Sequence, residues 1–116
     1  MTQATIYHNP RCSKSRETLA LLEQQGCDIN VVEYLKNPPT AKEISDILTK
    51  LGLSAREIMR TKETEYQTLG LADTSLTETQ LIEAMVNTPK LLERPIVLAN
   101  QRAAIGRPPE NVLEIL

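Results

Sequence analysis

The chain contains no tryptophan and no phenylalanine, so its core must be built from leucine, isoleucine and valine. No apolar run approaches the roughly 20 residues that a membrane-spanning helix needs, which predicts that the protein does not cross a membrane. A formal net charge of −2 provides no basic surface of the kind that binds nucleic acid. The length of 116 residues fits one compact domain.

Cysteine and histidine are also scarce, with only Cys12, Cys27 and His8 present. There is no Cys-x-x-Cys pair, and one histidine cannot complete an ordinary zinc site, so we predict no bound metal. The N-terminus lacks the basic and apolar regions of a signal peptide, which indicates a cytoplasmic protein. A reducing compartment disfavours a disulfide, and Cys27, at the end of a predicted helix, is expected to be structural.

The first third of the sequence predicts a strand, a helix and a second strand. Residues 4–7 are rich in β formers, residues 13–25 contain no helix breaker before Gly26, and residues 31–35 are again strand-like. A strand, a helix and a strand within such a short segment favour a parallel βαβ unit.

The middle of the chain predicts a helical insert over about residues 40–90. Its main signal is a threefold repetition of the capping box, in which a Ser or Thr begins a helix and a Glu or Gln three residues later bonds back to it. The three boxes are Thr40-x-x-Glu43, Ser54-x-x-Glu57 and Thr77-x-x-Gln80.

The β pattern returns after Pro89. Residues 95–99 and 102–106 flank Asn100-Gln101, a two-residue connection suited to a hairpin. A last helix is expected from about Pro108 to Leu116. The whole chain, residues 1–116, is therefore predicted to be a single α/β domain.

Cys12 is the strongest candidate for chemistry, because it lies between the first strand and the first helix. Unpaired N–H groups and the partial positive charge of a helix N-terminus favour a thiolate there, and they favour an anionic substrate. His8, Arg11, Lys14 and Arg16 are cationic neighbours in sequence. His8 taken alone is equally well explained as a loop residue or as a charge partner of the sulfur.

Three arginines form a second candidate group: Arg60 at the end of a predicted helix, Arg94 before Pro95, and Arg107 before Pro108. Guanidinium groups suit tetrahedral oxyanions because they stay charged and donate in a fixed fork. Arg94-Pro95 and Arg107-Pro108 bracket the predicted hairpin, which favours a site near the thiolate, although an arginine taken alone is more often a solvated surface residue.

Several motifs together resemble the glutaredoxin-coupled arsenate reductase family, with spacing preserved over nearly the whole chain. The matching segments are Tyr7-His8-Asn9-Pro10-x-Cys12-x-x-Ser15-Arg16, Tyr34-Leu35-x-Asn37-Pro38-Pro39, Arg60, Tyr66-x-x-Leu69-Gly70-Leu71, Arg94-Pro95-Ile96-Val97 and Gly106-Arg107-Pro108. The resemblance implies a thioredoxin-like fold with a helical insert, and a cis bond between Arg94 and Pro95.

The resemblance also implies the roles of individual residues. Cys12 would be the nucleophile, and His8 would help to keep it as a thiolate. Asn9 and Ser15 would orient the anion, and Arg60, Arg94 and Arg107 would bind arsenate and later arsenite. Cys12 would form a thiol–arsenate adduct, glutathione would reduce it and leave a mixed disulfide, and glutaredoxin would remove the glutathione. Glutathione is then a co-substrate, and no cofactor is bound.

Two other functions fit parts of the sequence. Spx-type transcription regulators share the fold and bind RNA polymerase, but Ser15 stands where their Cys-x-x-Cys switch needs a cysteine. A glutathione-dependent thiol oxidoreductase with another substrate would also use a reactive thiol and an anion site. A phosphatase-type reductase is disfavoured, because Arg16 follows Cys12 after three residues and that loop requires five.

Overall fold

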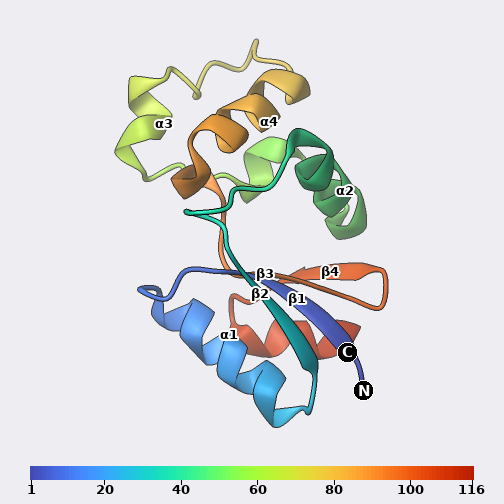
Figure 1. Ribbon diagram of the computed structural model, residues 1–116. Helices are drawn as coiled ribbons and strands as arrows, with labels where there is room; N and C mark the ends of the chain where they lie inside the picture. The colour runs from blue at the N-terminus through green and yellow to red at the C-terminus, as the bar shows by residue number, and fades with distance from the viewer. The chain divides into compact units, whose positions relative to one another are not determined.

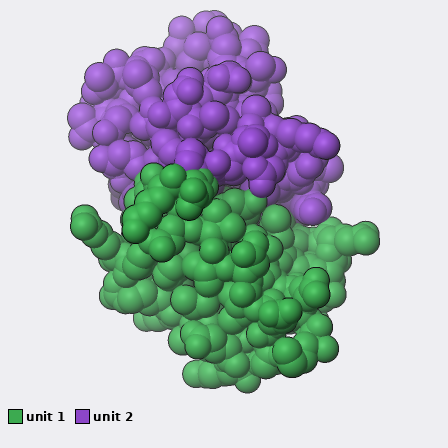
Figure 2. All heavy atoms as spheres, viewed as in Figure 1, with its two compact units in different colours: residues 1–37, 94–116 green, residues 38–93 purple.

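The computed structural model describes all of residues 1–116, which divide into two compact units (Figure 2). Residues 1–37 and 94–116 form the first unit, and residues 38–93 form the second. None of the helices combines the length and the apolar character that crossing a membrane requires.

A four-stranded sheet is the centre of the first unit, with strand order β2-β1-β3-β4 (Figure 1). Its strands are β1 (Gln3–His8), β2 (Asp28–Glu33), β3 (Ile96–Ala99) and β4 (Arg102–Ile105). Helix α1 (Ser13–Gln24) joins the parallel pair β1 and β2, whereas β3 runs antiparallel to both β1 and β4. The predicted βαβ unit and C-terminal hairpin are therefore confirmed.

One face of the sheet carries the core of the first unit. Helix α1 and the 3₁₀ helix η3 (Pro109–Ile115) contact each other and pack against this face (Figure 1). Alternate residues of a strand point to the same side, which explains why every second residue of β1 and β3 is apolar and buried here. The buried cluster consists of Ala4, Ile6, Leu22, Val97, Ala99, Val112 and Ile115.

The hairpin between β3 and β4 is closed by the predicted two-residue connection, Asn100-Gln101. Asn100 and Gln101 both have positive φ, 52° and 61°. Positive φ at both central positions defines the type I′ turn, whose twist matches that of the flanking strands. The Asn100 side chain also donates to the carbonyl of Ile115 over 2.8 Å, which ties the turn to the end of η3.

One predicted element was misplaced. Strand β2 covers Asp28–Glu33 rather than 31–35, because it is an edge strand with exposed polar positions and therefore lacks the apolar run used to find it. The last helix, expected from about Pro108 to Leu116, is confirmed as a 3₁₀ helix over Pro109–Ile115, with Pro108 as the preceding cap.

The second unit is helical, and all three predicted capping boxes form. In the first, Thr40 N–H donates to Glu43 Oε1 over 2.9 Å, and Glu43 N–H donates to Thr40 Oγ1 over 3.2 Å. Gly52 ends that helix with φ of 69°, a conformation that glycine adopts without strain. The helices are α2 (Ala41–Leu51), η1 (Ala55–Ile58), α3 (Thr64–Thr68), α4 (Glu78–Asn87) and η2 (Pro89–Leu91).

Candidate active site

Cys12 is the residue that immediately precedes α1. Its N–H donates to the carbonyl of Asn9 over 3.0 Å, and its own carbonyl accepts the N–H of Arg16 over 3.0 Å. Cys12 therefore closes a tight turn after β1 and begins the first turn of the helix. Its side chain is only 8% exposed, which places the sulfur at the edge of the buried interior.

A buried hydrogen-bond network fixes this turn from the other side. His8 Nδ1 lies 2.6 Å from Ser15 Oγ, and Asn9 N–H donates to the same hydroxyl oxygen over 3.0 Å. Asn9 Oδ1 in turn accepts the N–H of Arg11 over 3.0 Å. Because His8 ends β1 and Ser15 lies in α1, the network joins the strand, the turn and the helix.

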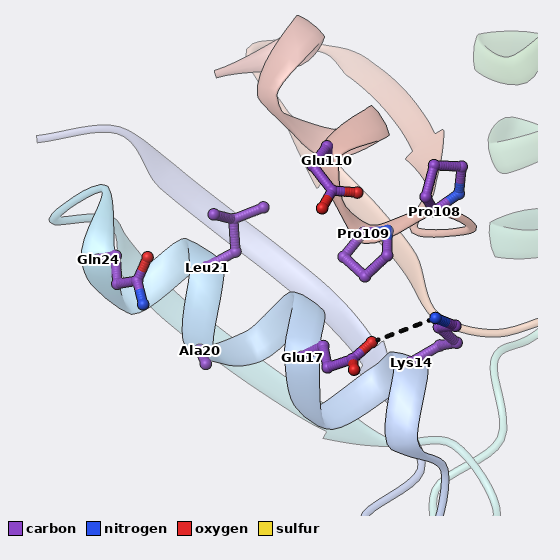
Figure 3. Close-up of a pocket in the computed structure, with 8 residues that line it drawn as sticks. All are labelled: Lys14, Glu17, Ala20, Leu21, Gln24, Pro108, Pro109 and Glu110. Atoms are coloured by element: carbon purple, nitrogen blue, oxygen red, sulfur yellow. Dashed lines mark ion pairs between the residues drawn. The ribbon is translucent and has the colours of Figure 1, made fainter.

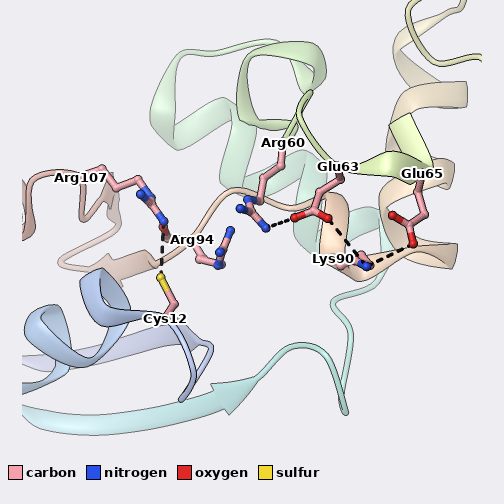
Figure 4. Close-up of polar contacts among 7 residues, drawn as sticks. All are labelled: Cys12, Arg60, Glu63, Glu65, Lys90, Arg94 and Arg107. Carbon is pink, nitrogen blue, oxygen red and sulfur yellow. Dashed lines mark hydrogen bonds and ion pairs between the residues drawn. The ribbon is translucent and has the colours of Figure 1, made fainter. Parts of the chain in front are cut away.

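The loop after β4 brings a guanidinium to the sulfur (Figure 4). Arg107 Nη2 donates to Cys12 Sγ over 3.4 Å, and Arg107 Nε donates to the carbonyl of Arg94 over 2.6 Å. Arg107 thus bridges the two segments that contain Cys12 and Arg94. The Arg94–Pro95 bond is cis, as predicted, and so is Arg107–Pro108.

Opposing effects act on the thiol of Cys12, and their balance lowers its pKa. Burial is the largest single contribution and raises the pKa, because it disfavours the charged thiolate. It is outweighed by the backbone N–H groups of Ser15 and Lys14 together with the positive charges of Arg94 and Arg107. The helix N-terminus and the two arginines therefore favour the nucleophilic form of the sulfur.

His8 is shifted so that its neutral form is favoured. Burial lowers the pKa of its imidazole, and the nearby Arg16 lowers it further, whereas Glu33 opposes the shift. A neutral imidazole can accept the hydroxyl proton of Ser15 at Nδ1, which leaves Ser15 Oγ to accept the N–H of Asn9. His8 is thus a hydrogen-bonding member of the network.

Arg60 belongs to the second unit, where it lies in a cluster of four charged side chains (Figure 4). Its guanidinium is paired with Glu63, and Lys90 Nζ lies 3.8 Å from Glu63 and 3.2 Å from Glu65. The backbone N–H of Arg60 donates to the carbonyl of Leu91 over 2.7 Å. This hydrogen bond holds the neighbouring Lys90 near Glu63 and Glu65. Sequence reasoning missed Glu63, although its spacing of three residues from Arg60 was an available signal.

An open groove of about 480 Å³ runs along α1 beside the start of η3 (Figure 3). A 3.5 Å ion pair between Lys14 and Glu17 lies on its wall. Cys12 is not among the groove's lining residues, which are Lys14, Glu17, Ala20, Leu21, Gln24, Pro108, Pro109 and Glu110.

Most of the candidate residues come together within the first unit. His8, Asn9 and Ser15 form one network, while Arg107 contacts both Cys12 and the backbone of Arg94. Cys27 lies apart from this site, partly buried against the apolar core. Nowhere in the structure do three or more His, Cys, Asp or Glu side chains gather in a way that could hold a metal ion.

Known proteins share both this sequence and this fold. The family model described as ArsC family matches residues 7–115. The uncharacterized protein YfgD of Escherichia coli K12 is 61% identical over 98% of this chain and 97% of its own. An arsenate reductase of Neisseria meningitidis is 52% identical over the full length of both chains.

A solved structure extends the likeness to three dimensions. The arsenate reductase from Vibrio cholerae has 52% identity and a TM-score of 0.96, covering 99% of this chain and 98% of its own. The thioredoxin-like fold that the sequence predicted is therefore confirmed. Because the family model covers nearly all of the residues, and relatives match from end to end, the chain belongs to the ArsC family.

Proposed function

We propose that this protein reduces arsenate to arsenite, with Cys12 as the nucleophile. The observation that carries the proposal is the 3.4 Å contact between the Arg107 guanidinium and the Cys12 sulfur, at a helix N-terminus that lowers the thiol pKa. This arrangement suits an attack by sulfur on an oxyanion, because both the attacking thiolate and the substrate are stabilised by positive charge. Relatives named arsenate reductase support the choice of oxyanion.

Each residue of the site receives a role in this proposal. Cys12 attacks arsenic, while Arg94 and Arg107 stabilise the thiolate and bind arsenate oxygens. For Arg60 the proposal rests on the family resemblance alone, which makes it a further arsenate ligand. Asn9 shapes the turn that presents the sulfur. His8 and Ser15 hold that turn against α1, so that the N–H groups of Lys14 and Ser15 face the negative charge.

The chemistry balances with two external thiols, one from glutathione and one from glutaredoxin. Cys12 forms a bond to arsenic as an oxygen of arsenate leaves as water. The glutathione thiolate then attacks the Cys12 sulfur, and the electron pair of the sulfur–arsenic bond passes to arsenic, reducing As(V) to As(III). The two thiols become one mixed disulfide between Cys12 and glutathione, and arsenite is released. Glutaredoxin takes the glutathione and restores the Cys12 thiol.

The external thiols are part of the proposal because the chain offers no second cysteine beside Cys12. Ser15 stands where a dithiol enzyme would have one, and its hydroxyl is engaged with His8 and Asn9. Cys27 packs against the core cluster of the first unit. We accordingly propose glutathione and glutaredoxin as electron donors, with no bound cofactor, in the cytoplasm.

The test is a coupled assay in which NADPH oxidation is followed with arsenate, glutathione, glutaredoxin and glutathione reductase. We expect turnover that rises with arsenate concentration and disappears in Cys12→Ser, which keeps the shape but not the nucleophile. No turnover above the Cys12→Ser background over millimolar arsenate would refute arsenate as the substrate. Activity with a mixed disulfide of glutathione instead would point to a general thiol oxidoreductase.

A further inference from the structure

Gly106 precedes Arg107 and is buried where the β4 end meets both α1 and Pro95. Its N–H donates to the carbonyl of Pro95 over 2.9 Å. A Cβ atom added at Gly106 would lie 2.5 Å from Thr18 Oγ1 and 2.8 Å from Pro95 Cγ. Its φ is not in the left-handed region, so close approach, rather than backbone conformation, requires glycine here.

The side chain of Thr18, which Gly106 approaches, is held in one orientation. It is completely buried in α1, and its hydroxyl donates to the carbonyl of Lys14 over 2.7 Å. Rotating the side chain away from Gly106 would break that bond. The same helix carries Cys12 at its N-terminus, so the contact between Thr18 and Gly106 links the segment that holds the sulfur to the segment that holds Arg107.

We propose that Gly106 and Thr18 are positioning residues, which set the distance between the Arg107 guanidinium and the Cys12 sulfur. Neither of them is a partner of the sulfur; they act through Arg107. In Gly106→Ala the new Cβ would lie 2.5 Å from Thr18 Oγ1. To reach an ordinary contact distance, the loop that contains Gly106 and Arg107 must move away from α1 by about 1 Å. A displacement of that size takes a 3.4 Å hydrogen bond to sulfur out of reach.

The experiment is the pH dependence of Cys12 alkylation by iodoacetamide in the full-length protein. In Gly106→Ala we expect the midpoint to move to higher pH, and the rate below the midpoint to fall about threefold or more. The matched control is Gly70→Ala in the second unit, where an added Cβ meets nothing within 4 Å but φ is +69°. This variant loses stability through backbone strain and should keep the wild-type alkylation profile.

Two further variants show whether the effect runs through these contacts. Thr18→Ala combined with Gly106→Ala removes the nearest clash, and should raise the midpoint of alkylation less than Gly106→Ala alone. If Gly106→Ala does not fold, the double variant is compared with Thr18→Ala instead. The midpoint should still be higher in the double variant, because the contact with Pro95 remains. In an Arg107→Ala background, Gly106→Ala should cause no additional rise.

The proposal fails if folded Gly106→Ala keeps the wild-type profile. It also fails if Thr18→Ala does not reduce the effect, or if the full rise recurs without Arg107. The kinetic part rests on the proposed function: the KM for arsenate should rise in Gly106→Ala more than kcat falls. Alkylation does not use arsenate, so an inactive wild type would refute the proposed substrate while the alkylation profiles still decide on Gly106.

Discussion

Arg107 donates a guanidinium N–H to the sulfur of Cys12 over 3.4 Å, although 95 positions separate the two residues in sequence. The guanidinium is held from a second side, because its Nε donates to the carbonyl of Arg94 over 2.6 Å. Arg16, which is close to Cys12 in sequence, instead donates to the carbonyl of Pro10 over 2.9 Å. The side-chain charges that act on the sulfur thus come from Arg94 and Arg107, which are distant in sequence, whereas its neighbours Lys14 and Ser15 contribute backbone N–H groups.

Replacing Arg107 by alanine should raise the pKa of the Cys12 thiol. The guanidinium stabilises the thiolate by charge and by a hydrogen bond, and burial then opposes ionisation with less compensation. Alkylation below the thiol pKa should slow by about three- to tenfold, measured as rate against pH. Arg107→Lys should restore part of the rate, because it keeps the charge but not the bridge to the Arg94 carbonyl.

The control for this measurement is Arg102→Ala. Arg102 is an exposed arginine of the same hairpin, and it donates to the carbonyl of Glu114 rather than to the sulfur. Its removal changes the net charge by the same amount and should leave the alkylation profile in place. An equal shift in both variants would mean that general charge, and not the contact with Cys12, sets the thiol pKa.

Local rules were enough to predict most of the fold. The three capping boxes form because each depends on side chains three residues apart, and Asn100-Gln101 forms the turn because a two-residue connection between antiparallel strands favours type I′. Strand β2 was misplaced because hydrogen bonding to β1 makes it a strand, with little burial to mark it. Helix α3, of five residues, was missed because so short a helix has no apolar period.

The sequence predicts candidate residues for the site but not the contacts among them. Cys12 can be recognised as a candidate from the sequence alone, because the start of a helix, and with it the partial positive charge there, is predicted from neighbouring residues. The contact of Arg107 with the sulfur depends on the close approach of Gly106 to Thr18, which the sequence does not predict. The hydrogen bonds of the Ser15 hydroxyl with His8 and Asn9 likewise depend on how β1 packs against α1.

Replacing Ser15 by alanine should destabilise the protein. The hydroxyl is fully buried, and its loss leaves His8 Nδ1 and the N–H of Asn9 without their partner. A buried polar group left unsatisfied costs about 1–3 kcal/mol, which exceeds the roughly 0.5 kcal/mol that alanine gains in helix propensity. We expect a lower free energy of unfolding in urea at constant m value.

Ser13→Ala is the matched control for Ser15, because Ser13 lies in the same turn of α1 but is exposed. Its stability should stay within about 0.5 kcal/mol of wild type. If Ser15→Ala were as stable as Ser13→Ala, the network around His8 would contribute nothing to folding. The assignment of Ser15 as a residue that holds the turn would then be wrong.

The stability of the protein should fall in mildly acidic solution through His8. Burial lowers the pKa of His8 in the folded state below 6.5, the ordinary value that the unfolded chain retains. Between that value and the lower folded pKa, the unfolded state binds more protons, so the free energy of unfolding decreases as the pH falls. Above the unfolded pKa the full contribution is present.

The measurement for His8 compares wild type with His8→Gln, which has a neutral side chain at every pH. Urea unfolding at about pH 7.5 and about pH 5.5 gives the stability difference between the two proteins, and this difference should shrink at the lower pH. Glu57, Glu65 and Asp73 also have lowered pKa values, but they are present in both proteins and cancel. A difference that grows towards acid would show that folding favours the protonated imidazole.

Replacing Cys27 by alanine should leave arsenate turnover near the wild-type rate, whereas Cys12→Ser should abolish it. Cys27 lies partly buried against the apolar cluster of the first unit, where a thiol behaves as a small hydrophobic side chain. The expected cost is therefore one of packing, about 1 kcal/mol in the free energy of unfolding.

Brief alkylation at about pH 6 should label wild type and Cys27→Ala equally and leave Cys12→Ser nearly unlabelled. Helix N–H groups and arginines favour the thiolate of Cys12, whereas Cys27 lies partly buried against the apolar cluster. A large loss of turnover in Cys27→Ala, with its stability intact, would instead make Cys27 a second redox thiol, and the chain would then not need glutathione to resolve the Cys12 adduct.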